Sequence, residues 1–409
     1  MTPTLLQRLK IALPIVQAPM AGADSPALAA AVSQAGGLGM LGCGMRSPAA
    51  MADAAAQVRA LTDTPFGMNL FVQATPTPSE AVVRAAMNRL APLYAQWGLT
   101  PEVPKQWCED FPAQFDALLT ARPAVASFTF GILSAAQVAQ LHAAGCCVIG
   151  TATTVEEARA WAHVGADAVC ASGMEGGGHR GSFLKVPRNP DLDGLLGRAP
   201  TRGSEDADDD AYAGTYSDAL SPADYAASML STLALVPQCV DALRIPVLAA
   251  GGIMDGRGIA AALALGAQAV QMGTAFLACP ESAIHPLHRQ ALSSATGTDT
   301  RSTRIFSGRP ARGIVNAMMQ QLAGDENAVP AYPVQNALTA PLRRAAAMQD
   351  KASHLSLWAG QGVAAVRPMP AAQLVRVLEQ EWRAAAAAAA GAAAGTALPV
   401  AAGEVQALR

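Results

Sequence analysis

The sequence is poor in charged and aromatic side chains, and its cysteines lack the spacing of a metal or disulfide framework. Only 14% of its 409 residues are charged, only 5% are aromatic, and the formal net charge is −3. This balance provides no basic surface for nucleic acid. The seven cysteines are an odd number without a CxxC pair, which indicates buried thiols in a reducing compartment. We therefore expect a cytoplasmic protein without a metal site or a nucleic-acid partner.

The sequence also lacks a long run of strongly hydrophobic residues. The longest apolar stretch, 384–402, is nearly all alanine and is interrupted by Gly391, Gly395 and Pro399. Such a stretch is too weakly hydrophobic for a membrane span. Its Ala/Gly-rich composition predicts a flexible tail over 383–409. Apolar residues still make up 51% of the chain, so the rest can bury a large core.

Short apolar runs alternate with alanine-rich helical runs over the first 280 residues or so. The predicted strands are 14–20, 38–43, 66–71, 125–130, 147–151, 168–171, 246–250 and 269–273. The predicted helices are 25–35, 48–61, 79–96, 135–144, 155–163, 224–243 and 258–265. Strands that are apolar throughout and separated by helices indicate a parallel sheet covered on both faces. The pattern predicts a (β/α)8 TIM barrel over 1–280, with a doubly wound open sheet as the alternative.

Two regions depart from this alternation. Residues 187–216 are polar and acidic, and we interpret them as a solvated loop insertion rather than a metal site, because consecutive acidic residues rarely converge on one ion. After Phe276 the strand pattern stops, and helical patterns cover 284–292, 314–322 and 340–348. We expect residues 281–382 to form a C-terminal helical lobe that packs on the barrel.

The most informative stretch is 173–181, which follows a predicted strand. It contains three consecutive glycines, then His179 and Arg180. Glycines let backbone N–H groups approach a ligand closely, and histidine titrates nearest neutral pH. In a barrel the active site lies where the strands end. The stretch therefore predicts an anion or flavin site beside a general base. The other histidines, His142, His163, His285 and His288, fall in helical segments where surface or packing roles are expected.

Glycines also follow the last two predicted strands, at Gly251-Gly252 and at Gly273-Thr274. Barrels often bind a phosphate with these two loops, so the pair predicts a phosphorylated cofactor. Asn69, an amide at the end of an apolar strand, is a candidate ligand contact, and Met20 and Ala21 can offer backbone groups to a flavin ring. The segment 37–42 matches GxGxxG, but its glycines end a helix and enter a strand. A nicotinamide fingerprint requires the opposite order.

Taken together, these motifs resemble the nitronate monooxygenase family, formerly called 2-nitropropane dioxygenases, and most closely its class I branch. The matching segments are 14–22, 35–39, 67–71, 127–131, 175–181, 246–253, 271–274, 307–313 and 358–361. The resemblance extends over about 14–362 and implies an FMN-dependent (β/α)8 barrel.

The resemblance also implies roles for single residues. His179 matches the catalytic histidine of the family. The FMN contacts match Met20, Ala21, Asn69, Gly177, Gly252, Gln271, Met272, Gly273 and Thr274. Two positions depart from the family pattern. Ser172 stands where the family usually has a flavin-holding glutamine, and Gly176 replaces the usual alanine before the glycines and histidine. A serine reaches less far than a glutamine, so flavin affinity is expected to differ.

The implied reaction is the oxidation of alkyl nitronates by O2 to a carbonyl compound and nitrite. Propionate 3-nitronate is the expected substrate, held by protonated His179 or by nearby N–H donors, in a monomer or homodimer. For neutral nitroalkanes, His179 would remove the α-proton. Two alternatives remain: an FMN-dependent NAD(P)H reductase of quinones or of enoyl-acyl carrier protein, and a non-catalytic flavin- or phosphate-binding barrel.

Overall fold

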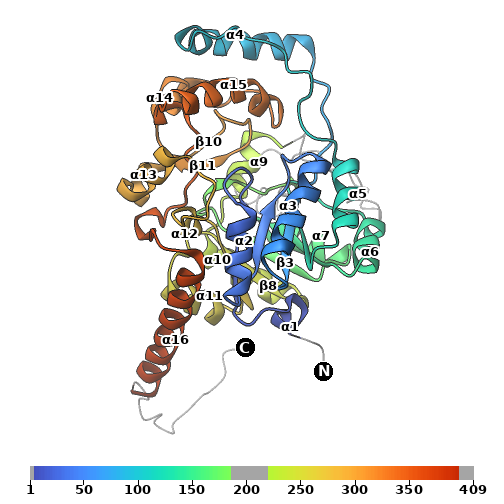
Figure 1. The fold of residues 1–409 in the computed structure, drawn as a ribbon, viewed down its shortest axis with the longest axis vertical. Coiled ribbons are helices and arrows are strands. Elements are labelled where there is room, and N and C mark those ends of the chain that lie inside the picture. The colour runs from blue at the N-terminus through green and yellow to red at the C-terminus, as the bar shows by residue number, and fades with distance from the viewer. Residues whose placement is uncertain (1–3, 186–219, 396–409) are drawn as a thin grey trace, which may run out of the picture.

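Eight parallel strands form the centre of the molecule (Figure 1). The computed structural model describes residues 4–185 and 220–395, so the predicted insertion at 187–216 lies outside the described residues. The strands are β1 (Ile15–Gln17), β2 (Gly39–Gly42), β3 (Phe66–Phe71), β4 (Val125–Thr129), β5 (Cys147–Ala152), β6 (Ala168–Ser172), β8 (Val247–Ala250) and β9 (Ala269–Met272). They pair in the order β1-β9-β8-β6-β5-β4-β3-β2, and a bridge between Val16 and Leu38 joins the first strand to the last. The predicted (β/α)8 barrel is confirmed.

Helices follow the strands and cover the outside of the barrel. They are α2 (Pro26–Gln34), α3 (Pro48–Leu61), α5 (Phe111–Ala121), α6 (Ala135–Ala143), α7 (Val155–His163), α10 (Thr232–Ala242) and α11 (Gly256–Ala264). The sequence analysis missed α5, which begins at the Asp110 cap. It also predicted one helix over 224–243, whereas the structure has α9 (Pro222–Ala227) and then α10. The break comes at Ser231, whose hydroxyl caps α10 by accepting from Ala234 N–H.

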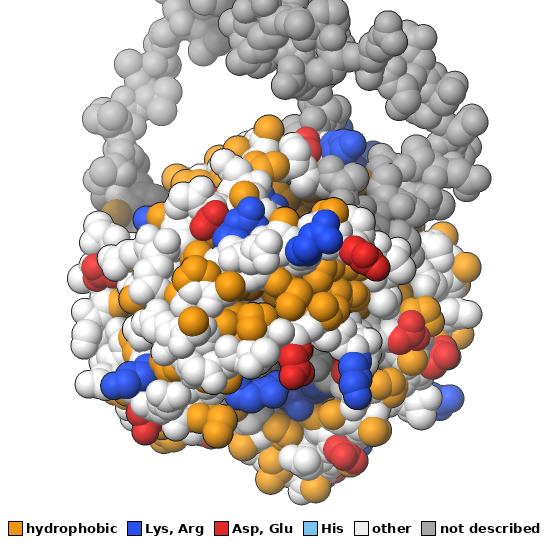
Figure 2. Space-filling model, turned by 90° about the horizontal axis from the view of Figure 1, so that it is seen from above, with side chains coloured by type: hydrophobic (Ala, Val, Ile, Leu, Met, Phe, Trp, Pro, Cys, Tyr) orange, Lys and Arg blue, Asp and Glu red, His pale blue; other side chains and the backbone are white. Residues whose placement is uncertain are grey.

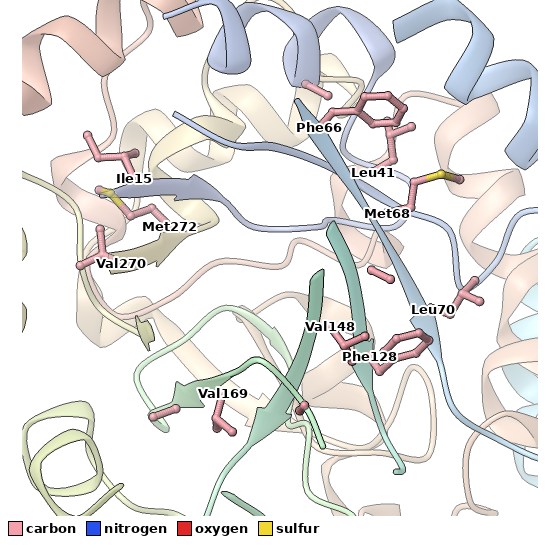
Figure 3. Close-up of a cluster of buried hydrophobic side chains, with 14 of the residues drawn as sticks. Ile15, Leu41, Phe66, Met68, Leu70, Phe128, Val148, Val169, Val270 and Met272 are labelled. Atoms are coloured by element: carbon pink, nitrogen blue, oxygen red, sulfur yellow. The ribbon is translucent and has the colours of Figure 1, made fainter. Parts of the chain in front are cut away.

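The period-2 alternation of strand side chains divides the barrel into two apolar layers. One set faces outward and packs beneath the helices, including Ile15, Met68 and Val169 (Figure 3). The alternate positions face the interior, where Val16 and Cys170 belong to a separate buried cluster. That inner cluster also contains the two buried leucines of α1 (Leu5–Leu9), which precedes β1. This inner cluster fills the interior of the barrel with side chains. An open site can therefore form only beyond the cluster, at the carboxyl ends of the strands.

An added lobe lies over those carboxyl ends (Figure 1). It contains the predicted helices, as α13 (Pro286–Ser294), α14 (Ala317–Gln321) and α15 (Val334–Met348). It also contains strands that the sequence analysis did not predict, since β10 (Thr300–Thr303) and β11 (Ala311–Ile314) pair antiparallel, and β11 pairs with β7 (Gly178–His179). The expected end of strand structure after Phe276 was therefore wrong. The sequence pattern did not reveal these strands because they are short and polar. They are stabilised by pairing with one another and with β7, which is part of the glycine loop.

Helix α4 (Glu80–Gln96) belongs to this lobe in space, although it follows β3 in sequence. Its buried residues Leu90 and Tyr94 join the cluster formed with α15, and the Tyr94 hydroxyl donates to the Leu338 carbonyl at 2.6 Å. The outer face of α4 exposes Val82 and Pro92. Seen from this side, apolar side chains gather in the middle of the surface, with charged groups around them (Figure 2).

The last helix, α16 (Ala371–Gly395), returns to the barrel and packs against α11 and α2. Leu374 and Leu378 belong to the main barrel core. The helix continues to Gly395, although the sequence predicted a flexible tail from residue 383; residues 396–409 lie outside the described residues. Among the helices that the structure describes, none has the length and apolarity to cross a membrane.

Candidate active site

A cavity of about 440 Å³ opens at the carboxyl ends of the barrel strands. Much of its wall comes from inward-facing residues at the strand ends. These residues continue the alternation that places the side chains of the inner cluster inside the barrel. Of the predicted site residues, nine line this cavity: Met20, Ala21, Asn69, Ser172, Gly177, His179, Gln271, Gly273 and Thr274. The structure thus gathers residues separated by more than 250 positions in the chain into one site.

Two predicted contacts lie outside the cavity wall. The side chain of Met272 is 1% exposed and packs in the outer apolar layer, because it follows the inward-facing Gln271 and so points to the opposite face of β9. Gly252 has φ +72° and lies against the Glu175 side chain, while its neighbour Gly251 lines the cavity. Both residues therefore support the site from behind its wall.

The glycine loop is held by contacts on both sides. The Glu175 carboxylate accepts from the backbone N–H and hydroxyl of Thr232 at 3.0 Å, at the start of α10. On the other side Gly177 lies against the chain at Gly360, where an added Cβ would stand 2.6 Å from the Gly360 nitrogen. Thr274 in turn accepts from Gly360 N–H at 2.9 Å. The loop is therefore fixed by close backbone packing that only glycine permits.

Arg180 does not offer its charge to the cavity. It is 5% exposed, and its guanidinium donates to the carbonyls of Ser172 and Ser228, each at 2.7 Å. The sequence analysis treated His179 and Arg180 as neighbours at one site. The structure separates them, because successive residues of the extended β7 segment point in opposite directions. Arg180 ties the end of β6 to the chain before α10.

His179 sits in an aromatic enclosure. Its ring centre lies 5.6 Å from those of Phe130 and Tyr332 and 5.4 Å from that of Trp358. Burial, together with the charges of Arg309 and Arg343, lowers the pKa of His179 to about 3. The imidazole is therefore neutral at physiological pH, which favours the nearby N–H donors over a protonated His179 as the groups expected to hold the anion.

Ser307 orients the His179 ring. Its hydroxyl lies 2.9 Å from His179 Nε2 and donates to the Arg309 carbonyl at 3.1 Å. When the hydroxyl donates to that carbonyl, Nε2 carries the ring proton and the lone pair is on Nδ1. No hydrogen bond to Nδ1 is formed by the residues that the structure describes. The arrangement presents a neutral imidazole with an unused basic nitrogen.

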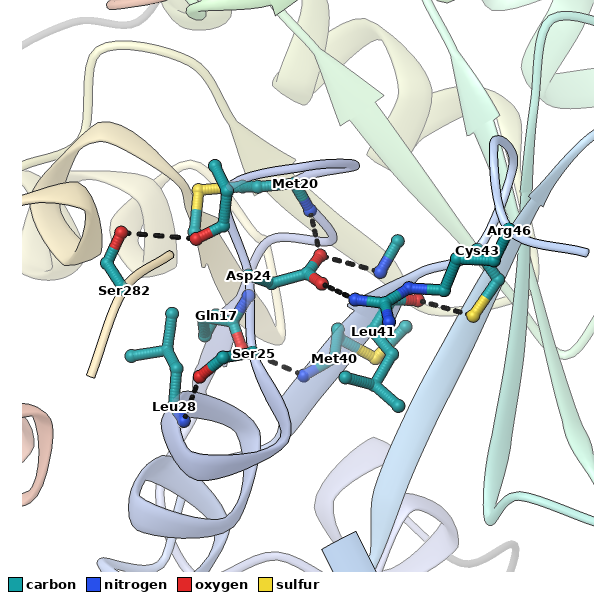
Figure 4. A network of polar contacts seen from close by, with 12 residues as sticks. Gln17, Met20, Asp24, Ser25, Leu28, Met40, Leu41, Cys43, Arg46 and Ser282 are labelled. Carbon is teal, nitrogen blue, oxygen red and sulfur yellow. Dashed lines mark hydrogen bonds and ion pairs between the residues drawn. The ribbon is translucent and has the colours of Figure 1, made fainter. Parts of the chain in front are cut away.

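The loop after β1 is fixed by a buried carboxylate that the sequence analysis did not identify (Figure 4). Asp24 is 2% exposed and accepts from Met20 N–H at 2.7 Å, from Gly42 N–H at 2.6 Å and from Arg46 at 3.1 Å. Burial outweighs these contacts and raises its pKa to about 6, so the group is ionised at neutral pH. Asp24 thereby positions the backbone of Met20, which lines the cavity.

Asp24→Asn is expected to lower the free energy of unfolding by about 1–3 kcal/mol, the cost of a buried polar group left unsatisfied. The amide oxygen can still accept the two backbone N–H bonds, but its NH2 then faces Arg46. Urea unfolding at neutral pH measures the loss, with Asp53→Asn, on the exposed face of α3, as the control. Equal midpoints for the two variants would contradict a positioning role for Asp24.

Several other cavity-lining residues were missed or misjudged from the sequence. His285 and His288 both line the cavity, although the sequence pattern assigned them to surface or packing. His288 also has a packing role, since its Nε2 lies 3.1 Å from the Trp358 carbonyl and burial lowers its pKa to about 4. Arg343 and Asn336 reach the cavity from α15. The sequence offered little indication that these residues belong to the site, because they reach it only through the position of the lobe over the strand ends.

The cavity fits a flavin. Its volume lies within the range of about 300–1,000 Å³ typical of ligand pockets, and the lining residues that the structure describes include no carboxylate to repel a phosphate. Gly176, Gly177, Gly251 and Gly273 bring backbone close to the cavity from three strand ends. Gly251 has φ +114°, and an added Cβ would stand 2.7 Å from the Thr232 hydroxyl. These glycine loops would hold the phosphate, and the Met20–Ala21 backbone with Asn69 would face the ring.

The structure combines a TIM barrel with glycine loops and a neutral histidine at the carboxyl ends of its strands. These features define the class of barrel enzymes that depend on a cofactor. The sequence profile described as nitronate monooxygenase matches residues 2–196 and 214–381. A nitronate monooxygenase of Pseudomonas aeruginosa is 41% identical over 389 residues, covering 94% of this chain and all of that protein. Among solved structures, nitroalkane oxidase from Streptomyces ansochromogenes is 39% identical with a TM-score of 0.78, covering 94% of this chain and 99% of its own. FabK from Thermotoga maritima is 28% identical with a TM-score of 0.68, covering 96% and 100%.

The chain belongs to the nitronate monooxygenase family. It is an oxidoreductase whose substrates are a small-molecule nitronate and O2, and membership implies a flavin cofactor. The higher identity to nitronate monooxygenases favours this function over the reductase alternative.

Proposed function

We propose that the protein binds FMN and oxidises propionate 3-nitronate with O2 to a carbonyl compound and nitrite. The observation that supports this most directly is that the neutral His179 imidazole and the glycine loops line the same cavity. When bound, the flavin supplies the electron transfer between nitronate and O2. The chain supplies binding, orientation and exclusion of water.

His179 is proposed as the catalytic residue. With Nε2 engaged by Ser307, Nδ1 can accept the α-proton of a neutral nitroalkane or a hydrogen bond from a bound group. Its lowered pKa makes it a weak base in the free pocket, which favours preformed nitronates over neutral nitroalkanes as substrates. Met20, Ala21, Asn69, Ser172, Gly177, Gln271, Gly273 and Thr274 are proposed to contact the cofactor, with Gly252 and Met272 supporting them.

The reductase alternative is tested by anaerobic mixing of the flavin-loaded protein with NADH or NADPH. We expect no rapid bleaching of the flavin by either nucleotide. Rapid bleaching would favour a reductase. Heat release of the cofactor followed by chromatography checks the proposal of FMN, and recovery of FAD would overturn it. Bound flavin without turnover of nitronate, quinone or enoyl substrates would support the non-catalytic alternative.

Two further expectations remain proposals. Free thiols at six of the cysteines, Cys43, Cys146, Cys147, Cys170, Cys239 and Cys279, are compatible with a reducing cytoplasm, and cell fractionation tests this location. The state as monomer or homodimer is tested by light scattering of the purified protein.

A further inference from the structure

Arg343 is the one permanently charged side chain among the described residues that line the cavity. It lies on α15, in the lobe above the strand ends, and its charge adds to burial and to Arg309 in lowering the pKa of His179. Burial lowers the pKa of Arg343 itself to about 10, so the guanidinium stays protonated at neutral pH. The cavity therefore combines a neutral base with a separate fixed cation.

Neutral groups hold this cation in place and leave part of it unsatisfied. Its Nη2 donates to the carbonyl and the side-chain oxygen of Asn336, both at 2.8 Å, and its Nη1 donates to the Ser356 hydroxyl at 3.3 Å. Its Nε is buried and has no hydrogen-bond partner in the part of the chain that the structure describes. No carboxylate there forms an ion pair with it. A partly buried cation that has a buried, unpartnered Nε and no counter-ion is costly unless a ligand supplies the charge.

We propose that Arg343 binds a carboxylate on the substrate and thereby selects nitronates that carry a second negative group. This inference rests on the proposed function. The glycine loops that fit the cofactor phosphate come from the ends of β6, β8 and β9, whereas Arg343 enters from the lobe. A substrate with a nitronate at one end and a carboxylate at the other fits this cavity, because the nitronate can lie beside His179 while the carboxylate binds Arg343. Arginine suits this role because its planar fork matches a carboxylate.

Two nitronates of equal length test the proposal. Propionate 3-nitronate carries a carboxylate where propyl-1-nitronate carries a methyl group. Because a hydrogen bond to a charged group is lost, Arg343→Gln should raise KM for the carboxylated substrate about 10- to 100-fold. KM for the alkyl substrate should change by less than about threefold, and kcat should change little for either. Arg343→Lys should be intermediate, since it keeps the charge without the fork. Arg344→Gln, exposed on the same helix, is the matched control.

An equal rise of KM for both nitronates in Arg343→Gln, or no rise for either, would overturn the proposal. A second measurement does not depend on turnover. Calorimetry should show that wild-type protein binds 3-nitropropionate about 10-fold or more tighter than 1-nitropropane, and that Arg343→Lys reduces this preference. Equal binding of both compounds by wild-type protein overturns the proposal even if Arg343→Gln fails to fold. If wild-type protein oxidises neither nitronate, the proposed function fails, whereas a retained preference for 3-nitropropionate still supports the carboxylate site.

Discussion

Replacing His179 by asparagine is expected to leave flavin binding intact and to reduce activity on neutral nitroalkanes about 10²-fold, the lower end of the usual contribution of a general base, because its lowered pKa makes it a weak base. Preformed nitronates need no proton removal, so their kcat/KM should fall much less. Asparagine is smaller and carries no basic nitrogen, and the glycine loops do not depend on the ring. Steady-state oxygen uptake with a nitroalkane and with its own nitronate measures the two effects in one experiment.

His142→Asn is the control, since this histidine pairs with Asp167 near the amino ends of β5 and β6, away from the cavity. It should leave both activities unchanged. An equal loss on both substrates in His179→Asn would exclude the general-base role and would indicate that His179 acts mainly in binding.

The pH dependence provides an independent check on His179. Its pKa is lowered to about 3 by burial and by the two arginines, so the imidazole is protonated only below about pH 3 and is neutral throughout the physiological range. The kcat/KM for a preformed nitronate should therefore show no inflection near the ordinary histidine pKa of about 6.5. A wild-type inflection near 6.5 that disappears in His179→Asn would show that the ring titrates normally.

Gly177→Ala is expected to weaken flavin binding about 5- to 150-fold, because the new methyl group would stand 2.6 Å from the Gly360 nitrogen and 2.7 Å from the Ala359 carbonyl carbon. Both of those atoms belong to backbone, so the contact can be relieved only by separating the glycine loop from the segment behind it. Overpacking of this kind costs about 1–3 kcal/mol or more. Fluorescence titration of apoprotein with FMN measures the dissociation constant directly.

Gly324→Ala, in the lobe, meets nothing within 4 Å and is the matched control. It should leave both flavin affinity and the unfolding midpoint unchanged. If Gly177→Ala bound flavin as tightly as wild-type protein, the cofactor would not depend on the packing of this loop against Gly360.

The sequence predicted the barrel well because two local signals agreed along its length. Strands such as β3 and β5 are apolar along most of their length, and caps such as Ser47 and Thr154 start the intervening helices. The expectation that a barrel's active site lies where the strands end, together with the family resemblance, then placed Asn69 and Gln271 in one cavity without any knowledge of tertiary contacts. The same period-2 pattern, applied residue by residue, would have shown that Met272 points away from it.

The sequence could not place the groups that reach the site from distant elements. Arg343 lies on a helix whose amphipathic pattern gives no hint of which barrel face it covers. Ser307 reaches His179 only because β11 pairs with β7, a three-stranded arrangement built on a two-residue strand. The neutral state of His179 likewise follows from three aromatic rings and two arginines that long-range packing assembles.

The central claim is that this cavity oxidises nitronates with O2 and needs no nicotinamide. Oxygen uptake by the purified flavin-loaded protein, supplied with propionate 3-nitronate alone, tests it most directly. We predict rapid uptake accompanied by nitrite release. Flavin-loaded protein that consumes no oxygen with this nitronate, but whose flavin is bleached by NADH or NADPH, would contradict the account and identify a reductase.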